Sequence, residues 1–305
     1  MSAATVPEPA AIPAGAPAAM PAGIPAELTA AVAPKAGREN FPVAPRFLPP
    51  ALRRDLTAIY GFARLVDDIG DEAPGSPAER ERLLDLVDAD LDRIAAGSLP
   101  QHPLLRQLVP TVTAHRLPLL PFRRLVEANR VDQRVTRYRT FDDLAAYCRL
   151  SANPVGHLVL GVFDAATPAR LARSDDVCTA LQLAEHWQDV AEDLARGRIY
   201  LPLEDLAAHG IDERDLATAP ASDAVRRLMA FQVRRARRML DEGAPLVATL
   251  AGPARVAVAA FVAGGRAALG AIAAADFDVL SATRRAGRLR LAREVVRALR
   301  TGGPR

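Results

Sequence analysis

Acidic side chains recur four residues apart at two places in this chain of 305 residues, within residues 60–72 and 182–196. In a helix with 3.6 residues per turn, this spacing puts each set on one face. The residues concerned are Asp67, Asp71, Glu185, Asp189 and Asp193. Stacked carboxylates repel one another, and each uncompensated charge in a dry interior costs about several kcal/mol. The spacing therefore predicts that the two faces bind something cationic.

Oxygen ligands suit Mg²⁺, which commonly takes one or two protein carboxylates and completes its shell with water and substrate phosphate oxygens. Two acidic helices that face each other predict a clamp for a diphosphate. Arg64 lies one turn before the first set, and Arg196 and Arg198 follow the second, so all three are candidates to bind phosphate oxygens. The alternatives are a solvated helix face for each acidic set and simple ion pairs for the arginines.

Three longer patterns accompany the acidic residues. DVAED at 189–193 is followed by GRIYLP at 197–202, residues 60–71 fit Y-x3-R-x2-D-x3-D, and residues 147–156 read YCRLSANPVG. With these motifs, the chain from about Glu39 to Arg300 resembles the squalene/phytoene synthases, the head-to-head branch of the class I isoprenyl diphosphate enzymes. Three segments, ENFPVA at 39–44, SANPVG at 151–156 and WQD at 187–189, together are most similar to the bacterial hydroxysqualene synthases.

The resemblance implies a role for each matching residue. The residues implied in catalysis are Tyr60, Arg64, Asp67, Asp71, Tyr147, Asp189 and Asp193. Those implied in substrate binding are Phe41, Arg64, Gln182, Arg198 and Tyr200. Those implied in Mg²⁺ binding are Asp67, Asp71, Glu185, Asp189 and Asp193. The family usually has Asn where this chain has Glu185, which remains a metal ligand but adds a negative charge.

The implied reaction is the Mg²⁺-dependent conversion of presqualene diphosphate to hydroxysqualene, with loss of diphosphate and capture of the carbocation by water. One alternative is a sister enzyme that condenses two prenyl diphosphates into presqualene diphosphate or phytoene. A more distant alternative is a non-catalytic, membrane-associated partner of a sister synthase. The last would need no functional aspartates, and the complete acidic sets argue against it.

Helical periodicity without strand alternation predicts an all-α protein, and the resemblance implies a class I isoprenoid synthase-like helical bundle with a central cavity. We expect an Ala/Pro-rich disordered leader at residues 1–36, a synthase domain at 37–300 and a flexible tail at 301–305. Thr140 followed by Asp143 predicts a helix capping box. The apolar stretch 256–265 predicts a core helix or tunnel wall, being too short to span a membrane.

The composition and the distribution of charge favour some kinds of binding partner over others. The net charge is only +3, yet residues 284–305 hold eight arginines against the single acid Glu294, which favours an anionic surface. Membrane lipid is the favoured partner and a solvated helix face the alternative, while no motif supports nucleic-acid binding. A dinucleotide fingerprint and an HExxH pair are absent. Without a secretory pattern, the expected location is the cytoplasm, with peripheral membrane attachment as an open alternative.

Overall fold

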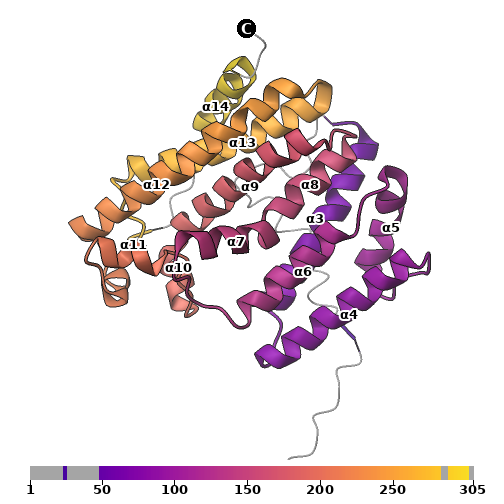
Figure 1. Cartoon of the computed structure of the whole chain (residues 1–305), viewed down its shortest axis with the longest axis horizontal. Helices are drawn as coiled ribbons and strands as arrows, with labels where there is room; N and C mark the ends of the chain where they lie inside the picture. Colours follow the sequence, from indigo (N-terminus) through magenta and orange to yellow (C-terminus); the bar gives the residue numbers. More distant parts are fainter. Residues whose placement is uncertain (1–22, 26–47, 283–287, 302–305) are drawn as a thin grey trace, which may run out of the picture.

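The computed structural model describes residues 23–25, 48–282 and 288–301 (Figure 1). These residues form helices and no strand, apart from an isolated bridge between Arg137 and Ile199. The prediction of an all-α bundle is therefore confirmed. The predicted leader, except residues 23–25, lies outside the described residues, as do Phe41 and residues 302–305 of the predicted tail.

Residues 50–162 supply one group of helices. They are α3 (Pro50–Asp71), α4 (Pro77–Ala95), α5 (Pro103–His115), α6 (Leu120–Asp132), α7 (Phe141–Ser151) and α8 (Asn153–Val162). The second half supplies α9 (Pro168–Gln188), α10 (Val190–Ala195), α11 (Leu203–Ala208), η1 (Glu213–Ala217), α12 (Asp223–Gly243), η2 (Ala244–Thr249), α13 (Gly252–Ala274) and α14 (Arg288–Thr301).

Local sequence signals set many of the helix starts. Proline occupies the first turn of α3, α4, α5 and α9, where its missing N–H would have no helical partner. Thr140 accepts a hydrogen bond from the backbone N–H of Asp143, whose carboxylate accepts one from the N–H of Thr140. The capping box predicted at the start of α7 is thus confirmed.

Two hydrophobic clusters form the core. One is built on α3, α4, α5, α6 and α8, and the other centres on α9, α12 and α13. In Figure 1, α3 and α6 lie on one side and α9, α12 and α13 on the other. The acidic faces predicted on α3 and α9 therefore belong to opposite halves of the bundle.

Helix α13 is the one helix among the described residues that is long and apolar enough to cross a membrane, with a mean hydropathy of 1.8. Of its most apolar 18-residue segment, 67% is buried inside the protein, where α13 packs against α9, α12 and α14. The stretch predicted at 256–265 as a core helix or tunnel wall is the middle of this helix. It is a wall of the cavity described below.

Candidate active site

The first acidic face lies along the C-terminal half of α3. Asp67 is exposed to a cavity, yet protein surrounds it so closely that desolvation raises the pKa of its carboxyl to about 7. Asn129 on α6 donates a hydrogen bond of 3.2 Å to Asp67, which lowers that pKa and fixes the carboxylate. This approach depends on Gly70, because a Cβ there would clash with the Asn129 side-chain oxygen.

The second acidic set differs from the single helix predicted for residues 182–196. Helix α9 ends at Gln188, Asp189 leaves helical geometry with φ −106° and ψ 15°, and α10 then begins. Hydrogen bonds still join the Asp189 N–H to the Glu185 carbonyl and the Asp193 N–H to the Asp189 carbonyl. The four-residue spacing of the acids is therefore kept through the break. Desolvation, together with the charge of Asp189, raises the pKa of Asp193 to about 7.

The segment after α10 brings the two acidic sets together. Its backbone is tied to the α6–α7 connection, where the N–H of Ile199 donates to the carbonyl of Thr136 and Arg137 donates to the carbonyl of Gly197. Arg198, held in this way, forms a 2.6 Å ion pair with Asp71 across 127 residues of sequence. The charge of Asp71 also raises the pKa of Asp193, so the two sets lie within electrostatic range of each other.

Arg64 forms the ion pairs that were one of the two alternatives weighed from the sequence. Its Nε lies 2.8 Å from the fully buried carboxylate of Asp68, and its Nη2 lies 3.6 Å from Glu72. The side chain nevertheless lines the cavity beside Asp67. Arg196 also lines the cavity and forms no ion pair with the described part of the chain. Both guanidinium groups are placed to bind an anion.

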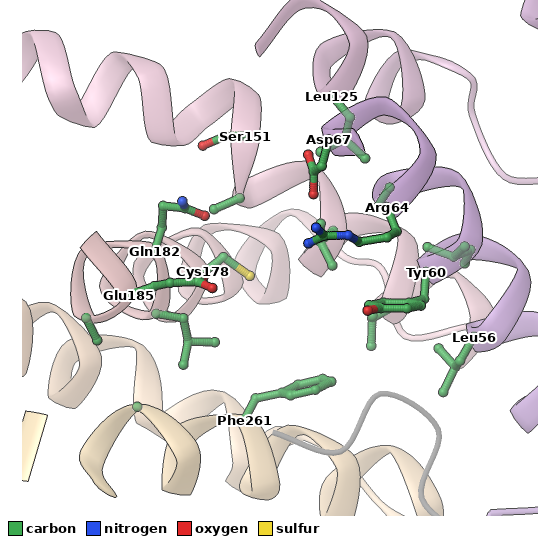
Figure 2. Close-up of a pocket in the computed structure, with 18 of the residues that line it drawn as sticks. Leu56, Tyr60, Arg64, Asp67, Leu125, Ser151, Cys178, Gln182, Glu185 and Phe261 are labelled. Carbon is green, nitrogen blue, oxygen red and sulfur yellow. The ribbon is translucent and has the colours of Figure 1, made fainter. Parts of the chain in front are cut away.

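A polar cavity of about 400 Å³ lies between the two acidic sets. A second, apolar cavity of about 190 Å³ adjoins it, and both are lined by Arg64, Asp67, Leu125, Ser151, Gln182 and Glu185. Figure 2 shows Tyr60, Arg64 and Asp67 of α3 on one side, Gln182 and Glu185 of α9 on the other, and Phe261 of α13 beyond them. The two cavities are therefore one continuous site with an ionic end and an apolar end.

The structure brings most of the predicted site residues to the polar end. They are Arg64, Asp67, Asp71, Tyr147, Gln182, Glu185, Asp189, Asp193, Arg198 and Tyr200. Tyr60, implied in catalysis, lines the apolar cavity rather than the polar one. The reason is that Tyr60 precedes Arg64 by one turn of α3, and this turn carries it away from the acidic end.

Three residues of the polar wall were not predicted from the sequence. Asn129 and Asp132 lie three residues apart on the inner face of α6, and His186 stacks on Tyr200 at 3.7 Å between ring centroids. The sequence pattern that could have revealed Asn129 and Asp132 is their position on the apolar face of an amphipathic helix, where polar side chains are unusual. Burial and the charge of Arg198 lower the pKa of His186 to about 3. The imidazole that lies 4.0 Å from the Asp193 carboxyl is therefore neutral.

The donor set of the polar cavity suits Mg²⁺ in kind, because it consists of carboxylates from two helices. Among the described residues, no three His, Cys, Asp or Glu side chains converge closely enough to hold an ion by themselves. This arrangement fits a cation that takes one or two carboxylates from each side and fills its remaining positions with water and phosphate. The site thus fits a metal–diphosphate complex better than a bare metal.

Comparisons with known proteins agree with this geometry. The sequence model of the family described as squalene/phytoene synthase matches residues 34–294. The chain is 34% identical over 221 residues to phytoene synthase of Arthrospira platensis, a match that covers 67% of this chain and 71% of that protein. It is 33% identical over 210 residues to hydroxysqualene synthase of Sinorhizobium fredii, covering 68% of this chain and 70% of the relative. For other curated phytoene synthases, the match spans between 52% and 81% of their length.

A solved structure of a squalene synthase is similar to this protein in its three-dimensional fold as well. The crystal structure of squalene synthase HpnC from Alicyclobacillus acidocaldarius superposes with a TM-score of 0.73 at 41% identity, covering 84% of this chain and 97% of the other. The fold and site therefore define a helical isoprenoid synthase. Within that class, the chain belongs to the squalene/phytoene synthase family.

Proposed function

We propose that this protein converts presqualene diphosphate into hydroxysqualene, with Mg²⁺ as cofactor. The observation that carries the proposal is the continuity between an ionic cavity and an apolar one, which matches a substrate with a diphosphate head and a long hydrocarbon body. Similarity to a hydroxysqualene synthase and to a squalene synthase of 41% identity supports this branch of the family.

In this proposal the arginines bind and hold the diphosphate. Arg64, Arg196 and Arg198 supply donors at the polar end, and their charges favour the departing anion when the carbon–oxygen bond breaks. The carbocation that remains lies among apolar and aromatic side chains such as Tyr60 and Phe261, which exclude water during the rearrangement. A water molecule then bonds to carbon and loses a proton, which gives the hydroxyl group.

The carboxylates that would hold Mg²⁺ are those of Asp67, Asp71, Glu185, Asp189 and Asp193. When bound, the metal would supply positive charge that neutralises the diphosphate. Asn129 and Arg198 orient Asp67 and Asp71 for this role, and the helix break at Asp189 turns α10 while keeping the acids in register.

Head-to-head condensation of two prenyl diphosphates is the second candidate, because phytoene synthases are also among the relatives. It would use the same ionic cavity and the same cofactor. A non-catalytic partner of a sister synthase is the third, and it would require neither the acids nor the arginines. The three differ in what they do with defined substrates.

The test is incubation of the purified protein with presqualene diphosphate and Mg²⁺ in ¹⁸O-labelled water, with and without a chelator, followed by mass spectrometry of the lipid product. We expect labelled hydroxysqualene that disappears with chelator. Consumption of farnesyl or geranylgeranyl diphosphate without turnover of presqualene diphosphate would move the assignment to a condensing synthase. Inertness toward all three would favour the partner role.

The location that we propose is the cytoplasmic face of a membrane, since substrate and product are lipids. The exposed face of α14 carries Arg293, Arg297 and Arg300 around Val296, a pattern suited to an anionic bilayer surface. A sister synthase that supplies the substrate is a further proposed partner, and the assay above, run with both proteins, would measure its effect on turnover.

A further inference from the structure

We propose that Asp132 is a positioning residue that holds the phenol hydroxyl of Tyr147 at the wall of the polar cavity. The inference deepens the proposed function and rests on it for the catalytic consequence. Asp132 is buried at the end of α6 and lies on neither acidic helix. It lines the same cavity as Asp67 and Asp71 but is not one of the residues implied in metal binding.

The geometry of the contact is specific. The hydroxyl of Tyr147 donates a 2.6 Å hydrogen bond to one oxygen of Asp132, and the hydroxyl of Tyr200 donates a 3.3 Å bond to the other. Both tyrosines and Asp132 line the polar cavity. One carboxylate therefore anchors two phenols that come from elements 53 residues apart, α7 and the segment after α10.

Ring packing leaves the phenols little freedom. The ring centroids of Tyr147 and Tyr200 are 5.8 Å apart, Tyr138 lies 5.5 Å and 5.7 Å from them, and His186 stacks on Tyr200. The rings fix where each oxygen lies, and Asp132 fixes which way the Tyr147 proton points. With that proton directed to Asp132, the oxygen offers lone pairs to its surroundings.

This orientation has a chemical consequence. Hydrogen bonding to a carboxylate polarises the phenol and raises the electron density on its oxygen. An oxygen lone pair beside the cavity stabilises positive charge that develops when diphosphate leaves. Asp132 would act through Tyr147 in this way.

The chain offers a matched control in Tyr138. Its ring belongs to the same cluster, but its buried hydroxyl has no hydrogen-bond partner among the described residues. Tyr138→Phe should leave kcat within about twofold of wild type, because no hydrogen bond is lost. Tyr147→Phe removes the oxygen that Asp132 holds, and Asp132→Asn removes the charge and replaces one of the two accepting oxygens by an NH2 donor.

The experiment is a double-mutant cycle on presqualene diphosphate turnover. We expect Asp132→Asn and Tyr147→Phe each to lower kcat about 10- to 100-fold with little change in KM, as for loss of a hydrogen bond to a charged group. The double variant should lose no more than about threefold beyond the larger single effect. Effects that multiply in the double variant would overturn the proposal. A Tyr147→Phe effect equal to that of Tyr138→Phe would also overturn it, and this second test does not need a folded Asp132→Asn variant.

A second readout does not need the substrate. The chain has four tyrosines, so ¹³C labelling of the phenol carbon gives four NMR signals. In Asp132→Asn the signals of Tyr147 and Tyr200 should move and that of Tyr60 should not. An unmoved Tyr147 signal would refute the positioning role, whereas moved signals in a protein inert toward presqualene diphosphate would refute only the proposed function.

Discussion

The charge on Asp67 links pH to stability and, in the proposed function, to metal binding. Its carboxyl has a pKa of about 7 in the folded protein and about 4 when unfolded, so the folded state binds the proton more tightly. The stabilisation of the folded state by this protonated carboxyl is fully present below pH 4 and is lost as the pH rises toward 7. In metal-free protein, Asp67→Asn should therefore raise the melting temperature at pH 8 relative to wild type, with a smaller difference at pH 5.

Mg²⁺ should reverse this pattern. The ion competes with protons for the carboxylates, so it should raise the melting temperature of wild type more at pH 8 than at pH 5. Calorimetry of both proteins with and without Mg²⁺ measures the two effects. An Asp67→Asn protein that responds to Mg²⁺ as wild type does at both pH values would contradict a metal role for this residue.

Asp189 and Glu185 allow the metal role to be tested by activity. Asp189→Asn should lower turnover about 100-fold or more, because a ligand charge is lost, without unfolding the protein. Glu185→Asn restores the residue that the family usually has, so activity should persist while the Mg²⁺ titration shifts. The controls are circular dichroism and Asp142→Asn, an exposed acid at the start of α7. Full activity of a folded Asp189→Asn variant would exclude the clamp, and an unchanged titration would count against Glu185.

At the scale of the helices, α6 connects the two halves of the site. Asn129 reaches Asp67 on α3, Gln133 just beyond the helix donates to the Gly70 carbonyl, and Asp132 reaches the tyrosines.

Helical spacing was enough to predict the acidic face of α3 and the capping box of α7. It did not predict the break at Asp189, because neither Gly nor Pro marks that position. Nor can a local pattern reveal a pair such as Arg198 and Asp71.

Gly70 tests the close approach of α3 and α6. Gly70→Ala places a Cβ against Asn129, so we expect a loss of about 1–3 kcal/mol, the usual cost of overpacking. In an Asn129→Ala background the same change should cost less, because the contacts with the side-chain amide are gone, the 3.3 Å approach to the Cβ of residue 129 remains, and alanine favours a helix over glycine. Urea unfolding of the four proteins measures this coupling. Equal effects in both backgrounds would show that the contact does not limit the packing.

At the scale of the whole molecule, α14 presents one face to α13 and another outward. Ala298 is buried on the inner face, and the Leu299 carbonyl accepts a hydrogen bond from Arg255 of α13. The outer face carries Arg293, Arg297 and Arg300, with Val296 47% exposed between them. The helix therefore offers cations and an apolar side chain on a surface that the described part of the protein leaves open.

We expect this face to bind anionic membranes. Each arginine near such a surface contributes about 1 kcal/mol, so replacing Arg293, Arg297 and Arg300 by Ala should weaken binding to phosphatidylserine vesicles about 100-fold. The matched control is the same loss of charge on α12, in Arg227→Ala/Arg234→Ala/Arg237→Ala, whose arginines are exposed and form no ion pair with the described residues. Vesicle flotation at low and high salt measures both. Equal losses in the two variants would mean that net charge alone drives binding, and wild-type protein that ignores the vesicles at low salt would remove α14 as a membrane surface.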